Sequence, residues 1–290
     1  MFKLGFRKKI KQKDYQRFSP PGAAPGTLVP APDSEKPVIR ILAYGESDLL
    51  ENEIENVSDI NELIEHWPVT WIDVSGLGDV KVIRQIGNIC NLHRLALEDV
   101  VTTDQRPKVE EYENDLFLVI RMLEAMDMSL AIDQLSMFIC QDYIVTFQST
   151  RSDCLDPVRD RIKKGRSKVR KSGADYLAYS IIDAVIDAYF PVLEEYGKKI
   201  EALEDRILEN PESHMITEIH EIRRDLLVLR RNIWPVREVL TSLTRETYPT
   251  ISEETRIYLR DCYDHALRIV DLIESYRLTC KDLMDLYLSL

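Results

Sequence analysis

No uninterrupted apolar run reaches the roughly 18 residues that cross a bilayer, so the sequence predicts no membrane span. The five cysteines are far apart and form no CxxC pair, which excludes a disulfide framework and indicates reduced thiols. Basic residues are outnumbered, and a net charge of −12 argues against nucleic acid as the main partner. The N-terminus lacks the continuous apolar stretch of a secretory signal. We expect this stretch of chain to be soluble and intracellular.

Enzyme signatures are also missing. The sequence contains no GxxxxGK[ST] phosphate loop and no HExxH motif, because His220-Glu221 lacks the second histidine. Gly76 and Gly78 alone do not make up the GxGxxG motif of a dinucleotide-binding fold. The five histidines are scattered, which disfavours a zinc site built on imidazole. The sequence therefore predicts that the chain is not an enzyme.

The N-terminal half changes composition near residue 37. Residues 1–36 are basic and then rich in Pro, Gly and Ala, which predicts a flexible tail that either touches anionic lipid or stays solvated. Residues 37–172 alternate helical signals with short runs rich in β-branched and aromatic residues, which predicts a layered α/β domain. The expected strands are 38–44, 69–74, 117–122, 135–140 and 143–147. Asp59 and Glu62 have the spacing of a helix-capping box.

The C-terminal half has a helical period. Residues 173–247 predict a long antiparallel hairpin of two limbs, each of about 30 residues and roughly 45 Å, with an acidic tip near residue 209. Pro191 and Pro235 should kink or restart these limbs. Residues 248–290 predict a third helix. Its apolar residues recur at steps of three and four, which is typical of coiled coils, and it has no stop signal, so we expect it to continue beyond Leu290.

Two sets of carboxylates lie where an unpaired negative charge would be energetically unfavourable. Asp183 and Asp187 lie one helical turn apart in an apolar stretch, so we expect them to be at least partly buried. Their partner would be either an arginine, such as Arg106 or Arg121, or a metal ion. The second set comprises the adjacent acids Glu98 and Asp99, and Asp261, which lies four residues before His265 on one helix face. Hard cations such as Mg²⁺ prefer such oxygen ligands.

Several segments resemble the CorA family of magnesium and cobalt channels. They are residues 95–112 (LALEDVVTTDQRPKVEEY), 115–122 (DLFLVIRM), 174–184 (ADYLAYSIIDA), 233–240 (IWPVREVL) and 260–265 (RDCYDH). The likeness runs in the same order over residues 37–290. Family members commonly carry His-Pro where this chain has His93-Arg94, so the loop geometry before Glu98 is an open question.

The resemblance implies an α/β/α domain, a long helical hairpin and a stalk helix that continues into the membrane. It implies a funnel-shaped homopentamer, with this chain on the cytoplasmic side of the cell membrane. The family's regulatory ions lie between neighbouring copies. The matching residues here are Glu98 and Asp99 from one copy and Asp261 from the next, with Asp183 as a further contributor. Mg²⁺, with Co²⁺ as a further cargo, would hold the closed state by bridging these acids.

Two alternatives remain open. Zinc transporters of the same superfamily share the architecture but differ in their cytoplasmic metal sites. A soluble coiled-coil scaffold without ion chemistry would explain the long helices alone.

Overall fold

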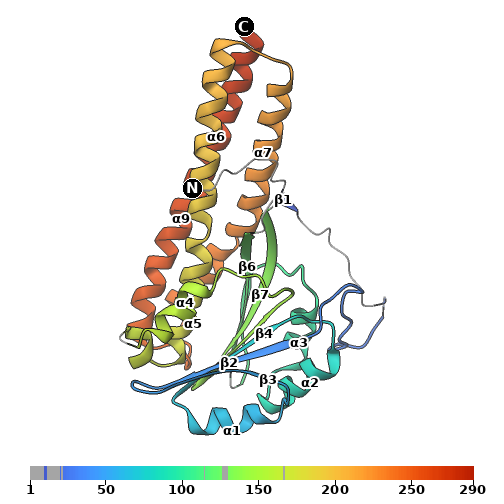
Figure 1. The fold of residues 1–290 in the computed structure, drawn as a ribbon, viewed down its shortest axis with the longest axis vertical. Coiled ribbons are helices and arrows are strands. Elements are labelled where there is room, and N and C mark those ends of the chain that lie inside the picture. The colour runs from blue at the N-terminus through green and yellow to red at the C-terminus, as the bar shows by residue number, and fades with distance from the viewer. Residues whose placement is uncertain (1–9, 12–19, 21, 114, 126–129, 166) are drawn as a thin grey trace.

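The computed structural model describes residues 10–11, 20, 22–113, 115–125, 130–165 and 167–290. Its N-terminal part is a mixed β-sheet with helices on both faces, and its C-terminal part is a set of long helices rising from one of those faces (Figure 1). The basic residues 1–9 and 12–13, for which the sequence allows a lipid contact, lie outside the described residues.

The sheet has the strand order β3-β2-β4-β8-β7-β6-β5. Strands β4 and β8 pair in parallel and the other neighbours on this path are antiparallel, while the short β1 pairs with β7 in parallel. The bounds are β1 Ile10–Lys11, β2 Val38–Tyr44, β3 Leu49–Ile54, β4 Val69–Ser75, β5 Lys108–Glu111, β6 Leu116–Ala125, β7 Leu130–Ile139 and β8 Tyr143–Gln148. All five strands expected from the sequence are present.

Alternating side chains divide the sheet between two cores. In β2, Ile39, Ile41 and Ala43 pack under α1 (Asp59–His66), α2 (Val80–Ile89) and α3 (Arg94–Val101), whereas Leu42 and Tyr44 face the other side. That second core contains α4 (Asp156–Lys163), the 3₁₀ turn η1 (Lys168–Lys171) and the long helices. The expectation of a layered α/β domain is thereby confirmed.

Helix α1 starts differently from the expected capping box. Its N-cap is Ser58, which makes no side-chain capping bond, and Asp59 is already the first helical residue. The side chain of Asn56 makes the hydrogen bonds at the start of this helix. Its Oδ1 accepts from the Ser58 amide at 3.3 Å, and its Nδ2 donates to the Asp59 carboxylate at 3.1 Å. The capping-box prediction is therefore wrong.

The two prolines divide each hairpin limb. α5 (Ala174–Asp187) ends just before α6 (Tyr189–Glu209), which contains Pro191, and α7 (His214–Ile233) is separated from α8 (Val236–Arg245) by Trp234 and Pro235. Together α5 and α6 cover residues 174–209, and α7 and α8 cover residues 214–245, so each limb has the expected length of about 30 residues or slightly more, in two segments.

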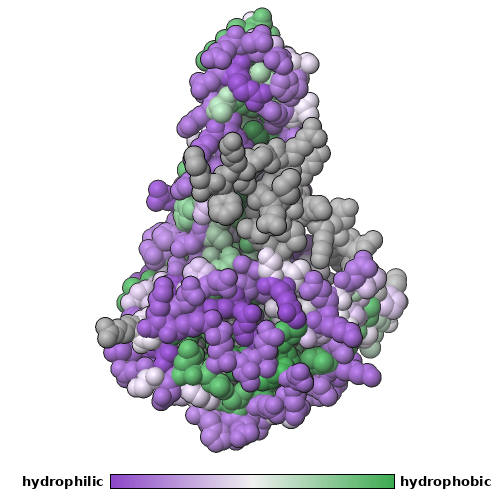
Figure 2. All heavy atoms as spheres, in the orientation of Figure 1, coloured by the Kyte–Doolittle hydropathy of each residue, from purple (hydrophilic) through white to green (hydrophobic). Residues whose placement is uncertain are grey.

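The third helix, α9 (Glu253–Ser289), is a single run of 37 residues. It packs along α5, α6, α7 and α8, and it contacts α6 and α7 more extensively than those two contact each other. The apolar residues of α9 that recur at steps of three and four are buried as far as Leu283, whereas Leu290 is 66% exposed. Figure 2 shows hydrophilic residues over most of the visible surface of the long helices and hydrophobic ones at the C-terminal end.

Residues 22–36 differ from the expected flexible tail. The Gly78 amide donates to Glu35 O at 2.7 Å, and Leu28 packs against the core under α1–α3. Gly76 has a φ of +93°, and a Cβ there would lie 2.4 Å from Lys36 O, so the segment passes close over this turn. The domain boundaries inferred from the sequence remain a prediction.

One helical stretch, Ala174–Glu209, is apolar and long enough to cross a membrane by length and composition alone. In the fold, 61% of its most apolar window is buried against other elements. Because a buried core helix passes the same test, this stretch carries no conclusion about a membrane span.

Candidate metal centre

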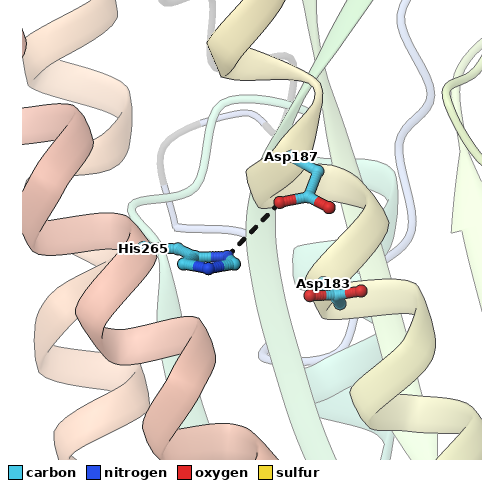
Figure 3. A group of neighbouring side chains, drawn as sticks. All are labelled: Asp183, Asp187 and His265. Atoms are coloured by element: carbon cyan, nitrogen blue, oxygen red, sulfur yellow. Dashed lines mark ion pairs between the residues drawn. The ribbon is translucent and has the colours of Figure 1, made fainter.

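Three side chains with metal-binding atoms meet between α5 and α9. The ligand atoms of Asp183, Asp187 and His265 all lie within 4.8 Å of one another (Figure 3). The helices pack closely here because the α9 residues facing α5 include the small, fully buried Cys262 and Ala266. Residues separated by one turn on each helix therefore point at the same space.

His265 lies between two carboxylates. Its Nδ1 is 3.4 Å from Asp187 Oδ1, and its Nε2 is 3.8 Å from Asp261 Oδ2, so Asp261 extends the cluster along α9. The Nδ1 atom is buried and has no hydrogen-bond partner among the described residues. A buried ring nitrogen without a hydrogen bond, beside two acids, fits a place where a cation binds.

Asp183 is the most buried acid of the group, with a side chain 14% exposed. Burial raises the pKa of Asp183, and the neighbouring Asp187 raises it further, while Arg161 and His265 act in the opposite direction. Arg161 is 3.9 Å away, and the Cys262 thiol also contacts the carboxylate, with its Sγ 3.9 Å from Oδ1. The cluster thus holds more negative charge than its described neighbours balance, and a divalent cation would relieve it.

An arginine does approach Asp183, but it is Arg161, at 3.9 Å. The two examples named from the sequence have other partners, because Arg106 pairs with Glu238 at 2.8 Å and Arg121 binds Asp104 and the Thr103 carbonyl. The expectation that Asp187 is at least partly buried is wrong, because its side chain is 52% exposed at the end of α5.

The other two expected ligands lie on α3, and both carboxylates have partners inside the chain. Glu98 Oε2 accepts from the Gly26 amide at 2.7 Å. Asp99 Oδ2 accepts from Lys108 Nζ at 2.6 Å, and the same ammonium donates to Glu110 at 2.7 Å. Burial raises the pKa of Asp99, which the hydrogen bond from Lys108 counteracts. Lys108 therefore holds the position beside Asp99 that a metal cation would take.

Within one chain the two halves do not meet. The buried side of α3 packs on one face of the sheet, whereas α5 and α9 pack on the opposite face. The structure therefore brings Asp183 and Asp261 together, adds Asp187 and His265, and leaves Glu98 and Asp99 apart. Each pair on its own helix was visible in the sequence as a four-residue step, but nothing in the sequence placed α5 beside α9.

The loop before Glu98 is well defined despite the missing proline. His93 is the N-cap of α3, where its Nδ1 accepts from the Leu95 amide at 3.4 Å. The His93 ring stacks on Tyr112 with centroids 4.4 Å apart. Arg94, which stands where the family commonly has proline, is the first residue of α3, so the helix starts from its His93 cap without that proline.

Asp115, just before β6 and close to His93, is 4% exposed, and its Oδ1 has no hydrogen-bond partner among the described residues. Burial raises the pKa of Asp115 to about 6, and His93 acts in the opposite direction. A carboxyl whose pKa is higher in the folded than in the unfolded state stabilises the fold most when it is protonated. Its contribution is complete below the ordinary pKa of about 3.9 and is lost as the pH rises through about 6.

We expect this carboxyl to lower the free energy of unfolding by about 1 kcal/mol between pH 5 and pH 7. Asp115→Asn should remove that part of the pH slope and make the chain more stable than the parent at pH 7. Urea unfolding at a series of pH values measures both effects. The same slope in parent and variant would contradict the assignment.

Comparison with known proteins agrees with this architecture. The sequence profile of the family described as "CorA-like Mg2+ transporter protein" matches residues 68–290. The chain is 38% identical over 271 residues to the cobalt/magnesium transport protein CorA of Thermotoga maritima, which covers 92% of this chain and 77% of that protein.

Two solved structures share the fold. The soluble domain of CorA from Methanocaldococcus jannaschii superposes with a TM-score of 0.74 at 20% identity, covering 87% of this chain and 97% of that one. The cytoplasmic domain of ZntB from Vibrio parahaemolyticus has a TM-score of 0.65 at 13% identity, covering 86% and 95%. At such identities the likeness concerns the fold alone. The profile match and the Thermotoga relative go further, and they show that the chain belongs to the CorA-like Mg²⁺ transporter family.

Proposed function

We propose that this chain is the cytoplasmic part of a divalent-cation transporter and that it senses Mg²⁺ at sites between neighbouring copies. One copy supplies Glu98 and Asp99 from α3, and the next supplies Asp183 and Asp261 from the α5–α9 cluster. Bound Mg²⁺ holds the assembly closed, and loss of the ion opens it. The chain has no catalytic role in this proposal.

The observation that carries the proposal is the excess of negative charge between α5 and α9. Asp183 is buried beside Asp187, with Asp261 close to His265 and Arg161 as the nearby full positive charge among the described residues. Asp183 is the desolvated carboxylate here, and burying its charge beside other acids is costly unless a cation compensates it. A divalent ion bound through oxygen ligands, with part of its water retained, supplies that charge.

A second copy is needed because the two halves lie on opposite faces of the sheet of one chain. Helix α9 offers a surface for self-association, since Ile257 and Leu278 are 62% and 63% exposed. These residues are three heptads apart and so lie on the same helix face. Leu288, 71% exposed, lies on the same helix. We infer a symmetric ring, and the family resemblance suggests five copies.

Gating follows from linkage. An ion that binds the closed ring more tightly than the open one stabilises the closed ring by RT ln(1 + [L]/Kd) per site. When Mg²⁺ falls, the acids of adjacent copies repel one another, and the closed ring loses that stabilisation. The acid from α3 must also exchange Lys108 for the ion, because Asp99 is already bonded to this side chain.

A second candidate ion is favoured by one observation. His265 contributes a nitrogen ligand, and Cys262 lies beside Asp183, whereas Mg²⁺ prefers oxygen alone. Co²⁺ and Zn²⁺ bind such mixed sets more readily. The name of the Thermotoga relative pairs cobalt with magnesium, so we propose Co²⁺ as a further ion. Competition of Co²⁺, Zn²⁺ and Mg²⁺ for the chain separates this function from that of a zinc transporter.

Millimolar Mg²⁺ is expected to raise the melting temperature of the chain and its resistance to proteolysis, because the folded assembly binds the ion. At a concentration of 100 Kd the stabilisation is about 2.7 kcal/mol per site. Asp183→Asn combined with Asp261→Asn should abolish the shift, since both carboxylates on the α5–α9 side lose their charge. Differential scanning fluorimetry with a Mg²⁺ titration measures it, and sedimentation with and without Mg²⁺ reports self-association.

The matched control is Asp205→Asn, which removes an exposed acid near the hairpin tip and should leave the Mg²⁺ response unchanged. A double variant that responds to Mg²⁺ like its parent would refute the site. A response lost equally in the control would show that Mg²⁺ acts on the general negative charge of the chain.

A further inference from the structure

A cavity separate from the acidic cluster lies between the segment 26–28, the C-terminal half of α2 and the start of α3. Its volume is about 480 Å³, within the range of small-molecule sites. The wall formed by the segment is fixed, because the Gly26 amide donates to Glu98 on α3. The floor is equally fixed, since Gly87 lies so close to Leu97 that a Cβ there would be 2.4 Å from Leu97 Cδ1. The cavity is therefore preformed.

Two arginines give this cavity its charge. Arg84 from α2 and Arg94 from α3 both line it, and neither has an ion-pair partner among the described residues. Both residues are exposed, and other exposed arginines, such as Arg245 and Arg260, also have no ion-pair partner among the described residues. The informative feature is therefore that two such guanidinium groups line one cavity. Two guanidinium groups at one cavity, without a counterion, attract an anion, and their planar fork suits phosphate oxygens.

The rest of the lining suits a flat polar ring better than a bare inorganic ion. Leu28 and Leu92 provide apolar walls. Asn88 and Asn91 add two carboxamides, each able to donate and accept hydrogen bonds, as the edge of a heterocycle requires. Asn91 is the residue that follows the C-cap of α2, and its backbone has a left-handed φ of 52°. This backbone conformation fixes the position of Asn91 at the rim of the cavity.

We propose that this cavity is a binding site for a small nucleoside phosphate. The phosphate would lie between Arg84 and Arg94, and the base would lie against the leucines with its edge toward the two asparagines. None of these four polar side chains belongs to the proposed Mg²⁺ sites, but Glu98, which accepts from the Gly26 amide at the cavity wall, is one of the proposed ligands. The test therefore excludes divalent ions.

The test is calorimetric titration of the chain with AMP, adenosine and inorganic pyrophosphate in buffer without divalent ions. AMP should bind saturably with a Kd below about 1 mM, and the other two at least about tenfold more weakly, because each lacks one half of the ligand. Arg84→Gln combined with Arg94→Gln should weaken AMP binding by at least about tenfold. Asn88→Trp should block it by filling the cavity while keeping both arginines.

Lys81→Gln is the matched control, since it removes one positive charge from the exposed side of α2 without touching the cavity lining. It should bind AMP like the parent. The proposal is overturned by absence of saturable AMP binding, by AMP binding that the double variant and Asn88→Trp retain, or by pyrophosphate binding as tightly as AMP. Equal weakening in Lys81→Gln would also overturn it, because the attraction would then come from the helix surface.

Discussion

Arg159→Met is expected to lower the free energy of unfolding by about 3–5 kcal/mol, because it leaves two buried carboxylates without their cation. Arg159 on α4 binds Asp73 of β4 at 2.6 Å and Asp153 at 2.5 Å, and the side chains of all three are at most 5% exposed. Burial raises the pKa of Asp73 despite this partner, so the acid depends on the arginine to stay ionised. Urea unfolding at pH 7 measures the loss.

The control for this variant lies on the same helix. Lys163 pairs with Glu51 at 2.9 Å, and both side chains are more than a third exposed, so Lys163→Met should change stability by no more than about 0.5 kcal/mol. Adding Asp73→Asn to Arg159→Met should recover part of the loss, since one uncompensated charge disappears. An Arg159→Met variant as stable as the control would show that this network contributes little.

Lys108→Met is expected to tighten Mg²⁺ binding by about tenfold or more, which is the second large effect. The Lys108 ammonium donates hydrogen bonds to both Asp99 and Glu110. Two opposite unit charges about 4 Å apart attract each other by about 4 kcal/mol at an effective dielectric constant of 20. Even a third of that energy amounts to a tenfold change in affinity. Methionine keeps most of the apolar stem of the side chain and removes the ammonium, which also lies 5.6 Å from the centroid of the Phe117 ring.

Competition between Lys108 and Mg²⁺ for Asp99 should have opposite effects on the stability of the Lys108→Met variant without and with Mg²⁺. Without Mg²⁺ the Lys108→Met variant should be less stable than the parent, because Asp99 and Glu110 then repel each other. With saturating Mg²⁺ the difference should shrink or reverse. Thermal unfolding across a Mg²⁺ titration gives both values, and Lys163→Met serves again as the control. Weaker Mg²⁺ binding in Lys108→Met would mean that the lysine positions the acid and does not compete with the ion.

The central strands were predictable because both of their faces are buried, so apolar and aromatic residues dominate there, although polar residues such as Asp73 and Gln134 are buried among them. The two edge strands on the main path were missed. β3 (LLENEI) and β5 (KVEE) carry charges where one side of the strand meets solvent, and such charges also protect an edge from pairing with another chain. Local composition therefore predicted the central strands of the sheet but not the edge strands β3 and β5.

In the candidate site, too, the relations within one helix were predictable from the sequence, and the contacts between distant elements were not. The steps Asp183 to Asp187 and Asp261 to His265 were readable, because they lie within single helices. The partner of Asp183 was not, since Arg161 reaches it only after α4 has packed beside α5. Lys108 was missed as the partner of Asp99 for the same reason, as their contact joins α3 to the edge strand β5.

The unbroken course of α9 makes it a lever arm. It carries His265 near its base and extends about 24 residues further, roughly 36 Å, without a proline or glycine that would absorb a bend. A tilt of about 5° at the level of His265 would move the far end by about 3 Å, at the 1.5 Å rise per residue of an α-helix. A sub-ångström adjustment around an ion at the base would thus become a displacement as wide as a water molecule at the tip.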